Sequence, residues 1–268
     1  VSGGVGQAMA QTESATEQSG IDEIIVTASK RATSLQDTAL SVSAISGADL
    51  SKQGVTSFHE IINTIPGVTL IDGGPDGSSL VFRGIATSPF AGGNRTTSTY
   101  IDDFPLALGD IHIQLVDMEQ IEVLKGPQGT LYGQSALGGV MRYITNKPNP
   151  DALAGGLDFT SENITSGGTG YKAQGHINVP LSENVAIRAA FYNYDRPGFI
   201  DNLGTNHKDV NNYEVTGGRL ALRWDISDNV VFNALYLNQT SRVNAGQGDG
   251  SQAPTSTYTP VIDNSVPT

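Results

Sequence analysis

The stretch that decides the fold is IEVLKGPQGTLYGQSALGGVMRYITNKP, from Ile121 to Pro148. It sets five glycines, at positions 126, 129, 133, 138 and 139, between two strand-like runs, IEVLK and VMRYIT. Glycine-rich loops beside strands often bind phosphates, and GQSAL is close to a serine-nucleophile motif. The loop is therefore a candidate nucleotide cradle, a candidate hydrolase elbow, or a loop with no chemistry of its own.

Both chemical interpretations fail on spacing. A phosphate-binding P-loop needs a lysine after its glycines, whereas Lys125 precedes them, and a dinucleotide fingerprint must run into a helix. The nucleophile motif needs a glycine two residues after its serine, where this chain has Leu137. The four histidines are scattered without metal-ligand spacing. We therefore expect no catalytic residue, no metal ligand and no cofactor, and we assign the glycines to positive φ angles and close backbone approach.

Upstream of this loop, short strand-like and helix-like segments alternate from Leu35 onward. Ser46-x-x-Asp49 opens one short helix, Ser57-x-x-Glu60 caps another, and Asp102-Asp103 reads as a hairpin turn. The expected strands are Leu40–Ile45, Val68–Ile71, Leu80–Ile85, Thr99–Asp102, Ile121–Lys125 and Val140–Thr145. The pattern predicts a small α+β domain, a mixed sheet with short helices.

Downstream of Pro150 the pattern changes to long alternating strands. Tight turns at 180–184 and 226–229 alternate with long polar connections, as in outer-membrane barrels. A soluble sandwich shows the same alternation of side chains, but not this alternation of loop lengths. The expected strands are Leu153–Ser161, Tyr171–Val179, Val185–Tyr194, Arg219–Asp225 and Val230–Gln239. We therefore predict the first strands of a transmembrane antiparallel, all-β barrel.

Composition narrows the function classes. The formal charge of −12, from 27 acidic and 15 basic residues, argues against nucleic acid as a partner. No cysteine is present, so disulfides and thiolate metal sites are excluded for this chain. Ala8-Met9-Ala10 has the form of a signal-peptide cleavage site, and we expect both ends of the sequence to be truncated.

Several motifs, in order, resemble the plug domain of TonB-dependent outer-membrane receptors. KGPQGTLYGQSALGGVMRYITNKP resembles the closing segment of that plug, and LQDTALSVSAISGADL, IINTIPGV, FRGI and YIDDFP resemble the segments before it. DEIIVTA, residues 22–28, resembles the TonB box. Two positions depart from the family pattern: Asp103 stands where glycine is frequent, and Lys125 where arginine is common.

The resemblance implies a domain order and a mechanism. We expect the end of a signal peptide at 1–10, a disordered periplasmic segment with the box at 11–34, the plug at 35–150 and incomplete barrel at 151–268. In the implied mechanism, ligand binding outside exposes the box, which adds as a strand to the periplasmic domain of TonB. The residues expected to bind TonB are Asp22, Glu23, Ile24, Ile25, Val26, Thr27 and Ala28.

The resemblance also implies a ligand side and a location. We expect a monomeric receptor in the outer membrane of a Gram-negative bacterium, in contact with its lipid, importing a ferric siderophore. Cobalamin, glycans or another nutrient remain alternative cargoes, and a passive porin or surface-binding protein remains the alternative class. The expected ligand contacts are Asp76, Phe90, Asn94, Arg95, Asp110 and His112, and the expected plug–barrel contacts are Arg83 and Lys125.

Overall fold

The structure is a computed structural model. It describes residues 25–27, 33–38, 40–53, 55, 61–62, 64–71, 79–86, 96–106, 114–133, 136–165, 167–201, 208–209, 211–243 and 261–263.

A five-stranded mixed sheet, which we call the central sheet, organises the N-terminal half of the chain. Strands β7 and β10 run parallel, and the other neighbouring pairs run antiparallel. The spatial order is β3 (Val42–Ser46), β9 (Met118–Lys125), β10 (Gly139–Thr145), β7 (Thr97–Ile101) and β8 (Phe104–Pro105). The predicted α+β class on a mixed sheet is confirmed, and Asp102-Asp103 forms the turn between β7 and β8.

Smaller elements flank the central sheet. Helix α1 (Gly47–Lys52) follows β3, and the backbone N–H of Asp49 donates to the Ser46 hydroxyl at 3.1 Å, as the sequence predicts. Strands β4 (Val68–Ile71), β5 (Ser79–Phe82) and β6 (Ile85–Ala86) form a three-stranded sheet. The capping box expected at 57–60 lies outside the described residues.

One strand prediction is wrong. The segment expected as a single strand over residues 80–85 is a hairpin, in which Arg83 and Gly84 turn the chain from β5 into β6. Both turn residues have positive φ, 49° and 83°, as the hairpin turns that match the twist of antiparallel strands require. The sequence masks this turn because arginine rarely adopts that conformation.

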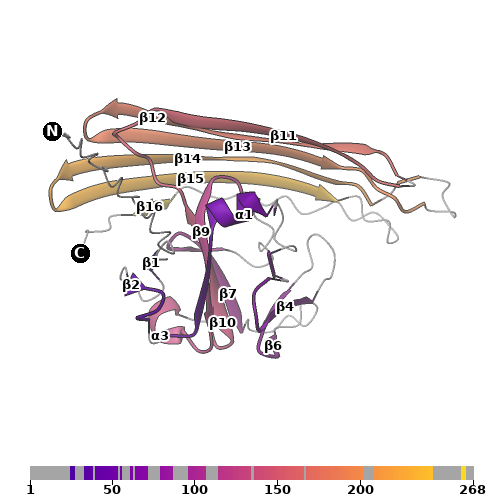
Figure 1. Ribbon diagram of the computed structural model, residues 1–268, viewed down its shortest axis with the longest axis horizontal. Helices are drawn as coiled ribbons and strands as arrows, with labels where there is room; N and C mark the ends of the chain where they lie inside the picture. Colours follow the sequence, from indigo (N-terminus) through magenta and orange to yellow (C-terminus); the bar gives the residue numbers. More distant parts are fainter. Residues whose placement is uncertain are drawn as a thin grey trace, which may run out of the picture.

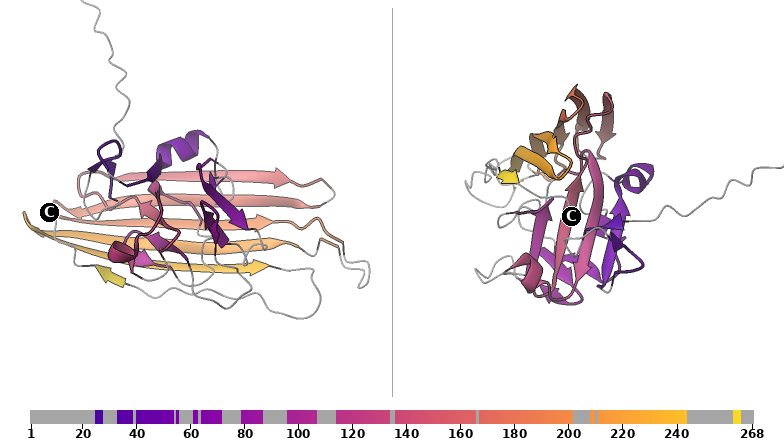
Figure 2. Two further views of the ribbon diagram at one scale, coloured as in Figure 1. Left: turned by 90° about the horizontal axis from the view of Figure 1, so that it is seen from below. Right: turned by 90° about the vertical axis from the view of Figure 1, so that its left-hand side faces the viewer.

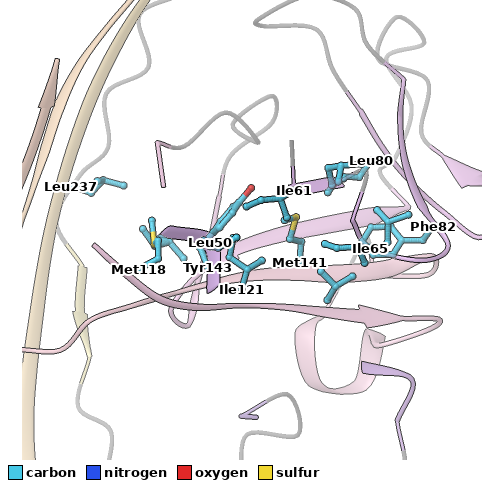
Figure 3. Close-up of a cluster of buried hydrophobic side chains, with 14 residues drawn as sticks. Leu50, Ile61, Ile65, Leu80, Phe82, Met118, Ile121, Met141, Tyr143 and Leu237 are labelled. Atoms are coloured by element: carbon cyan, nitrogen blue, oxygen red, sulfur yellow. The ribbon is translucent and has the colours of Figure 1, made fainter. Parts of the chain in front are cut away.

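The apolar core lies on one face of the central sheet (Figure 3). Alternation along β9 and β10 places Ile121, Val123, Met141 and Tyr143 on this face. They pack against apolar side chains that the flanking segments supply, namely Leu50, Ile61, Ile62, Ile65, Val68, Leu80 and Phe82. The buried core thus ties the flanking segments to the central sheet.

A second sheet, which we call the wall sheet, contains long antiparallel strands. They follow sequence order: β11 (Ala154–Asn163), β12 (Thr169–Ser182), β13 (Val185–Arg196), β14 (Tyr213–Ser227), β15 (Val230–Val243) and β16 (Val261–Asp263). Two-residue turns at 183–184 and 228–229 join β12 to β13 and β14 to β15. The predicted barrel-like strands are confirmed, and each is longer than the sequence indicated.

The central sheet stands against one face of the wall sheet. Figure 1 shows β7, β9 and β10 running away from the layer that β11 to β15 form, and the views in Figure 2 agree. Leu237 of β15 belongs to the same buried cluster as Met118 of β9, so the two sheets share apolar packing. Apolar side chains such as Ile177, Leu220 and Trp224 are exposed on the wall sheet. Among the described residues, no helix is long and apolar enough to span a membrane.

The glycine-rich loop closes the far end of β9 and β10. Its ends meet where the N–H of Gly126 donates to the carbonyl of Gly138 at 2.8 Å, and Gly126 has a φ of 103°. A Cβ on Gly139 would lie 2.5 Å from both the Leu124 carbonyl oxygen and Cδ1 of Phe82. These two glycines have the structural roles that the sequence predicts. Gly129 has no such need, because a Cβ there would meet no atom within 4 Å.

Candidate functional site

The expected TonB box lies against the central sheet. Strand β1 (Ile25–Val26) pairs antiparallel with β2 (Thr33–Ser34), so this apolar strand has a partner within the chain. Of the expected box residues, the structure describes Ile25, Val26 and Thr27. The remaining four, Asp22, Glu23, Ile24 and Ala28, lie outside the described residues.

The two residues of strand β1 differ in solvent exposure. Ile25 is 46% exposed, whereas Val26 is fully buried among Leu124, Tyr132 and Val140. These side chains lie on the face of the central sheet opposite the core that Figure 3 shows, because Leu124 and Val140 alternate with Val123 and Met141. Full burial of a valine side chain stabilises by about 1.5–3 kcal/mol, so Val26 stabilises the packing of strand β1 against the central sheet.

Three polar side chains of β9 and β10 bind the box strand. Nε2 of Gln120 donates to the carbonyl oxygen of Ile25 at 3.0 Å. The N–H of Thr27 donates to Oε1 of Glu122 at 2.6 Å, and Nη1 of Arg142 donates to the Thr27 hydroxyl at 2.8 Å. Gln120, Glu122 and Arg142 therefore form the docking cluster of the box.

The docking cluster is held together by a buried ion pair. Nη1 of Arg142 lies 2.5 Å from Oε2 of Glu122, and both side chains are almost completely buried. The Arg142 guanidinium also lies 5.8 Å from the ring centroid of Tyr132, within cation–π range. Burial raises the pKa of the Tyr132 hydroxyl to about 12, so the ring stays neutral at physiological pH.

A second cluster joins the central sheet to the wall sheet. Asp117, the residue before β9, accepts two hydrogen bonds from Arg188 of β13, from Nε at 2.8 Å and from Nη2 at 2.5 Å. Nη2 of Arg219 on β14 donates to the same carboxylate at 2.7 Å and to the Asp117 carbonyl oxygen at 2.9 Å. Nδ2 of Asn146 adds a bond at 2.8 Å from the end of β10.

The backbone and the burial of Asp117 fit this role. Its φ of 57° turns the chain sharply before β9, and aspartate tolerates this conformation better than most residues. The carboxylate side chain is fully buried. Burial by itself would raise the pKa of Asp117, but the hydrogen bond from Arg188 and the positive charge of Arg219 outweigh it and hold the pKa below its usual range. Asp117 is therefore ionised and anchors one sheet to the other.

The two expected plug–barrel cations lie side by side at the other end of the central sheet. Nη2 of Arg83 donates to the Ser41 hydroxyl at 2.6 Å, and Nζ of Lys125 donates to the Ser43 hydroxyl at 2.8 Å. Burial and the nearby charge of Arg83 lower the pKa of Lys125. No carboxylate among the described residues forms an ion pair with either cation.

The expected ligand contacts are not placed. Asp76, Phe90, Asn94, Arg95, Asp110 and His112 all lie outside the described residues. Within the part of the chain that is described, no three acidic or histidine side chains cluster as a metal site.

Sequence reasoning missed both clusters. Gln120, Glu122 and Arg142 carried a usable signal, because polar side chains at alternate positions of otherwise apolar strands mark a face that binds something polar. Asp117 carried no such signal, since its partners stand 71 and 102 residues further along the chain.

Comparisons with known proteins agree with this architecture. Residues 34–140 match the family model of the TonB-dependent receptor plug domain. The pesticin receptor of Yersinia pestis is 26% identical over 215 residues, which cover 78% of this chain and 30% of that receptor. The catecholate siderophore receptor Fiu of Escherichia coli is 27% identical over 209 residues, covering 75% of this chain and 24% of Fiu.

A solved structure shares the fold. The ferric yersiniabactin uptake receptor FyuA from Yersinia pestis superimposes with a TM-score of 0.66 at 21% identity, over 76% of this chain and 32% of FyuA. The chain thus spans less than a third of the curated relatives that it matches here. Residues 34–140 are therefore a plug domain of the TonB-dependent receptor kind, and the strands that follow resemble the start of the barrel in the matched structure.

Proposed function

We propose that the receptor containing this chain imports a scarce ligand across the outer membrane by TonB-dependent active transport, and that the ligand is a ferric siderophore. The observation that carries the proposal is the docked box: an apolar strand, Ile25–Val26, held against the plug by side chains rather than built into the central sheet. Such a strand can be released without dismantling the sheet, and it can then pair with a partner's edge strand. A passive porin requires no partner protein, so this class does not account for a releasable strand.

The partner in this proposal is the periplasmic domain of TonB. Residues 22–28 would supply the added strand, and the order of segments would be signal peptide end, box segment, plug and barrel, with boundaries at residues 10, 34 and 150. The apolar side chains exposed on the wall sheet, such as Leu220 and Trp224, would contact outer-membrane lipid. The receptor would act as a monomer.

Replacing Ile25 by proline tests this assignment. Proline removes a backbone donor from the strand and restricts its φ, so energised uptake should be abolished while ligand binding at the cell surface persists. Ile25→Val, which keeps a β-branched apolar side chain, is the matched control and should transport normally. Normal uptake by the proline variant would refute the box assignment.

The cargo proposal rests on the relatives. The matched proteins include receptors named for a catecholate siderophore and for ferric yersiniabactin. In this chain we propose that Asp76, Phe90, Asn94, Arg95, Asp110 and His112 contact the ligand, with Arg95 supplying positive charge to an anionic chelate. Arg95→Ala should weaken binding about ten- to a hundredfold, the value of one charge-assisted hydrogen bond.

Cobalamin and glycans remain the alternative cargoes, and growth separates them from iron. A deletion strain should lose growth under iron starvation, and expression should rise when iron is withheld. Growth loss confined to a sugar or a cobalamin source would contradict the iron proposal and leave the transporter class intact.

We also propose that Arg83 and Lys125 contact carboxylates of barrel strands beyond those of this chain. The surroundings of these two cations support the proposal: among the described residues, each cationic side chain donates to a serine hydroxyl. Two neighbouring positive charges repel each other, and a nearby carboxylate would offset that repulsion. Charge reversal of either residue should therefore weaken assembly of the plug in the complete receptor.

A further inference from the structure

We propose that Arg142 is the positioning residue that keeps the TonB box docked, and that its contact with the β7–β8 hairpin couples that hairpin to the box. The inference rests on the proposed function and specifies how the box is regulated. Arg142 stands on β10 at the point where three separate parts of the plug meet: the box, strand β9 and the hairpin turn.

Arg142 contacts the box through one of its nitrogens, Nη1. Nη1 donates both to the Thr27 hydroxyl at 2.8 Å and to Oε2 of Glu122 at 2.5 Å. The other oxygen of Glu122 accepts the backbone N–H of Thr27 at 2.6 Å and Nε2 of Gln120 at 3.0 Å. Arg142 is the cation paired with this buried carboxylate and holds it in place, so the bond to the box backbone depends on Arg142 even though Arg142 does not make it.

The contacts of Arg142 with the hairpin are longer and more exposed to solvent than its contacts with the box. Nη2 lies 3.3 Å from Oδ1 of Asp103, whose side chain is 44% exposed, and 3.5 Å from the Asp102 carbonyl oxygen. The Nε–H of Arg142 is buried without an acceptor, so the hydrogen bonds of the guanidinium are made by its two outer nitrogens. A change in the position of the hairpin therefore acts on the guanidinium directly.

The hairpin is followed in sequence by two of the proposed ligand contacts. Strand β8 is followed by Leu106, whose N–H donates to the Thr99 carbonyl oxygen at 2.9 Å, and then by residues 107–113. That segment carries Asp110 and His112, two of the proposed ligand contacts. A displacement of the β7–β8 hairpin would weaken the Nη2 contacts, while the box contacts lie on the other outer nitrogen of the same side chain.

Both edges of the box strand are engaged while Arg142 is in place. One edge pairs with β2, and on the other the Ile25 carbonyl and the Thr27 N–H are bound by Gln120 and Glu122. Strand addition to another protein requires a free edge. Docked and released boxes are thus two distinct states, and the bonds of Gln120, Glu122 and Arg142 to residues 25 and 27 favour the docked one.

The test uses the complete receptor with a single reporter cysteine. This chain contains no cysteine, and any cysteine in the rest of the receptor is replaced by serine. Val26→Cys, at a position that is fully buried when docked, then reports box release through its rate of reaction with a maleimide. In ligand-free receptor, Arg142→Met should raise this rate at least about tenfold, the effect of losing one charge-assisted hydrogen bond. Arg142→Lys keeps the charge but not the fork, and should fall between the two. Arg223→Met, which removes an arginine paired with Asp225 on the wall sheet, is the matched control and should leave the rate unchanged.

Two further measurements separate box release from general loosening. The affinity of ligand-free receptor for added TonB periplasmic domain should rise in parallel with the maleimide rate. Hydrogen exchange across residues 79–86, on the opposite face of the plug, should not change. An unchanged maleimide rate in folded Arg142→Met receptor, or a rise accompanied by equal loosening of residues 79–86, would overturn the inference.

Milder variants keep the inference falsifiable where Arg142→Met does not assemble. Thr27→Val removes the hydroxyl that accepts from Arg142 and donates to Oε1 of Glu122 at 3.2 Å, and Asp103→Asn removes the charge that Arg142 meets on the hairpin. Each should raise the maleimide rate several-fold. Unchanged rates in both would equally refute it. Failure of the proposed function looks different: the maleimide rates would follow Arg142 as stated, but no variant would bind TonB periplasmic domain.

Discussion

Replacing Asp117 by asparagine should loosen the plug from the wall sheet without changing the shape of either. Asparagine has nearly the same size as aspartate and tolerates the φ of 57° at this position. It removes the negative charge that Arg188 and Arg219 share, and it keeps one oxygen that can accept a hydrogen bond. The substitution therefore tests the contribution of the Asp117 charge separately from that of its size and shape.

The expected cost follows from the burial of the cluster. Arg219 is 4% exposed and Arg188 12% exposed, so the substitution leaves two poorly solvated cations without a counter-ion. Breaking a buried ion pair by removing one partner typically costs about 3–5 kcal/mol. Because the remaining oxygen still accepts one bond, we expect the lower end, about 3 kcal/mol, which is a factor of roughly 100 in the equilibrium between attached and detached plug.

Hydrogen exchange in the complete, detergent-solubilised receptor measures this factor directly. The amide of Asn146, which donates to the Asp117 carbonyl oxygen at 3.2 Å, and the amides beside it at the anchor should exchange about 100-fold faster in Asp117→Asn, because detachment exposes them. Asp225→Asn is the matched control: Asp225 pairs with Arg223 at 2.8 Å, but both side chains are partly exposed, so the effect should stay within about 1 kcal/mol. Equal exchange in Asp117→Asn and the parent would show that the cluster does not hold the plug, and the anchoring argument would be wrong.

Three further outcomes follow from the same structure. Because the pKa of Asp117 is lower in the folded than in the unfolded state, its stabilisation is complete above about pH 4 and is lost as the pH falls through the folded value; the difference in exchange between the parent and Asp117→Asn should therefore shrink in acid and persist at pH 7. Gly139→Ala places a Cβ 2.5 Å from the Leu124 carbonyl oxygen and should destabilise the plug by about 1–3 kcal/mol in thermal unfolding, whereas Gly129→Ala, with nothing within 4 Å, should be neutral or slightly stabilising. We expect residues 195–212 to face the outside and residues 180–184 the periplasm, so external protease on whole cells should cut within 195–212 and spare 180–184; the reverse pattern would invert this orientation.

Local patterns in the sequence were sufficient to predict the fold class of both parts of the chain. The alternation along residues 171–179 and the short turns predicted long antiparallel strands, because a strand with one apolar face shows its period in the sequence itself. The glycines at 126 and 139 predicted a positive φ and a close approach, since few other residues tolerate either. Local sequence failed at Arg83-Gly84, where the turn needs a conformation that arginine seldom adopts.

The partners of the charged side chains were decided only by the tertiary structure. Polar residues at 120, 122 and 142 were visible as exceptions in apolar strands, but the box strand that they bind lies about 95 residues or more from each of them in sequence. Asp117 meets Arg188 and Arg219 because the chain turns back and stands the central sheet against the wall sheet. Periodicity and propensity act over a few residues, whereas the energy of a buried charge depends on which distant group comes within about 3 Å of it. That distance is set by how the two sheets assemble, and it cannot be predicted from any single stretch of the sequence.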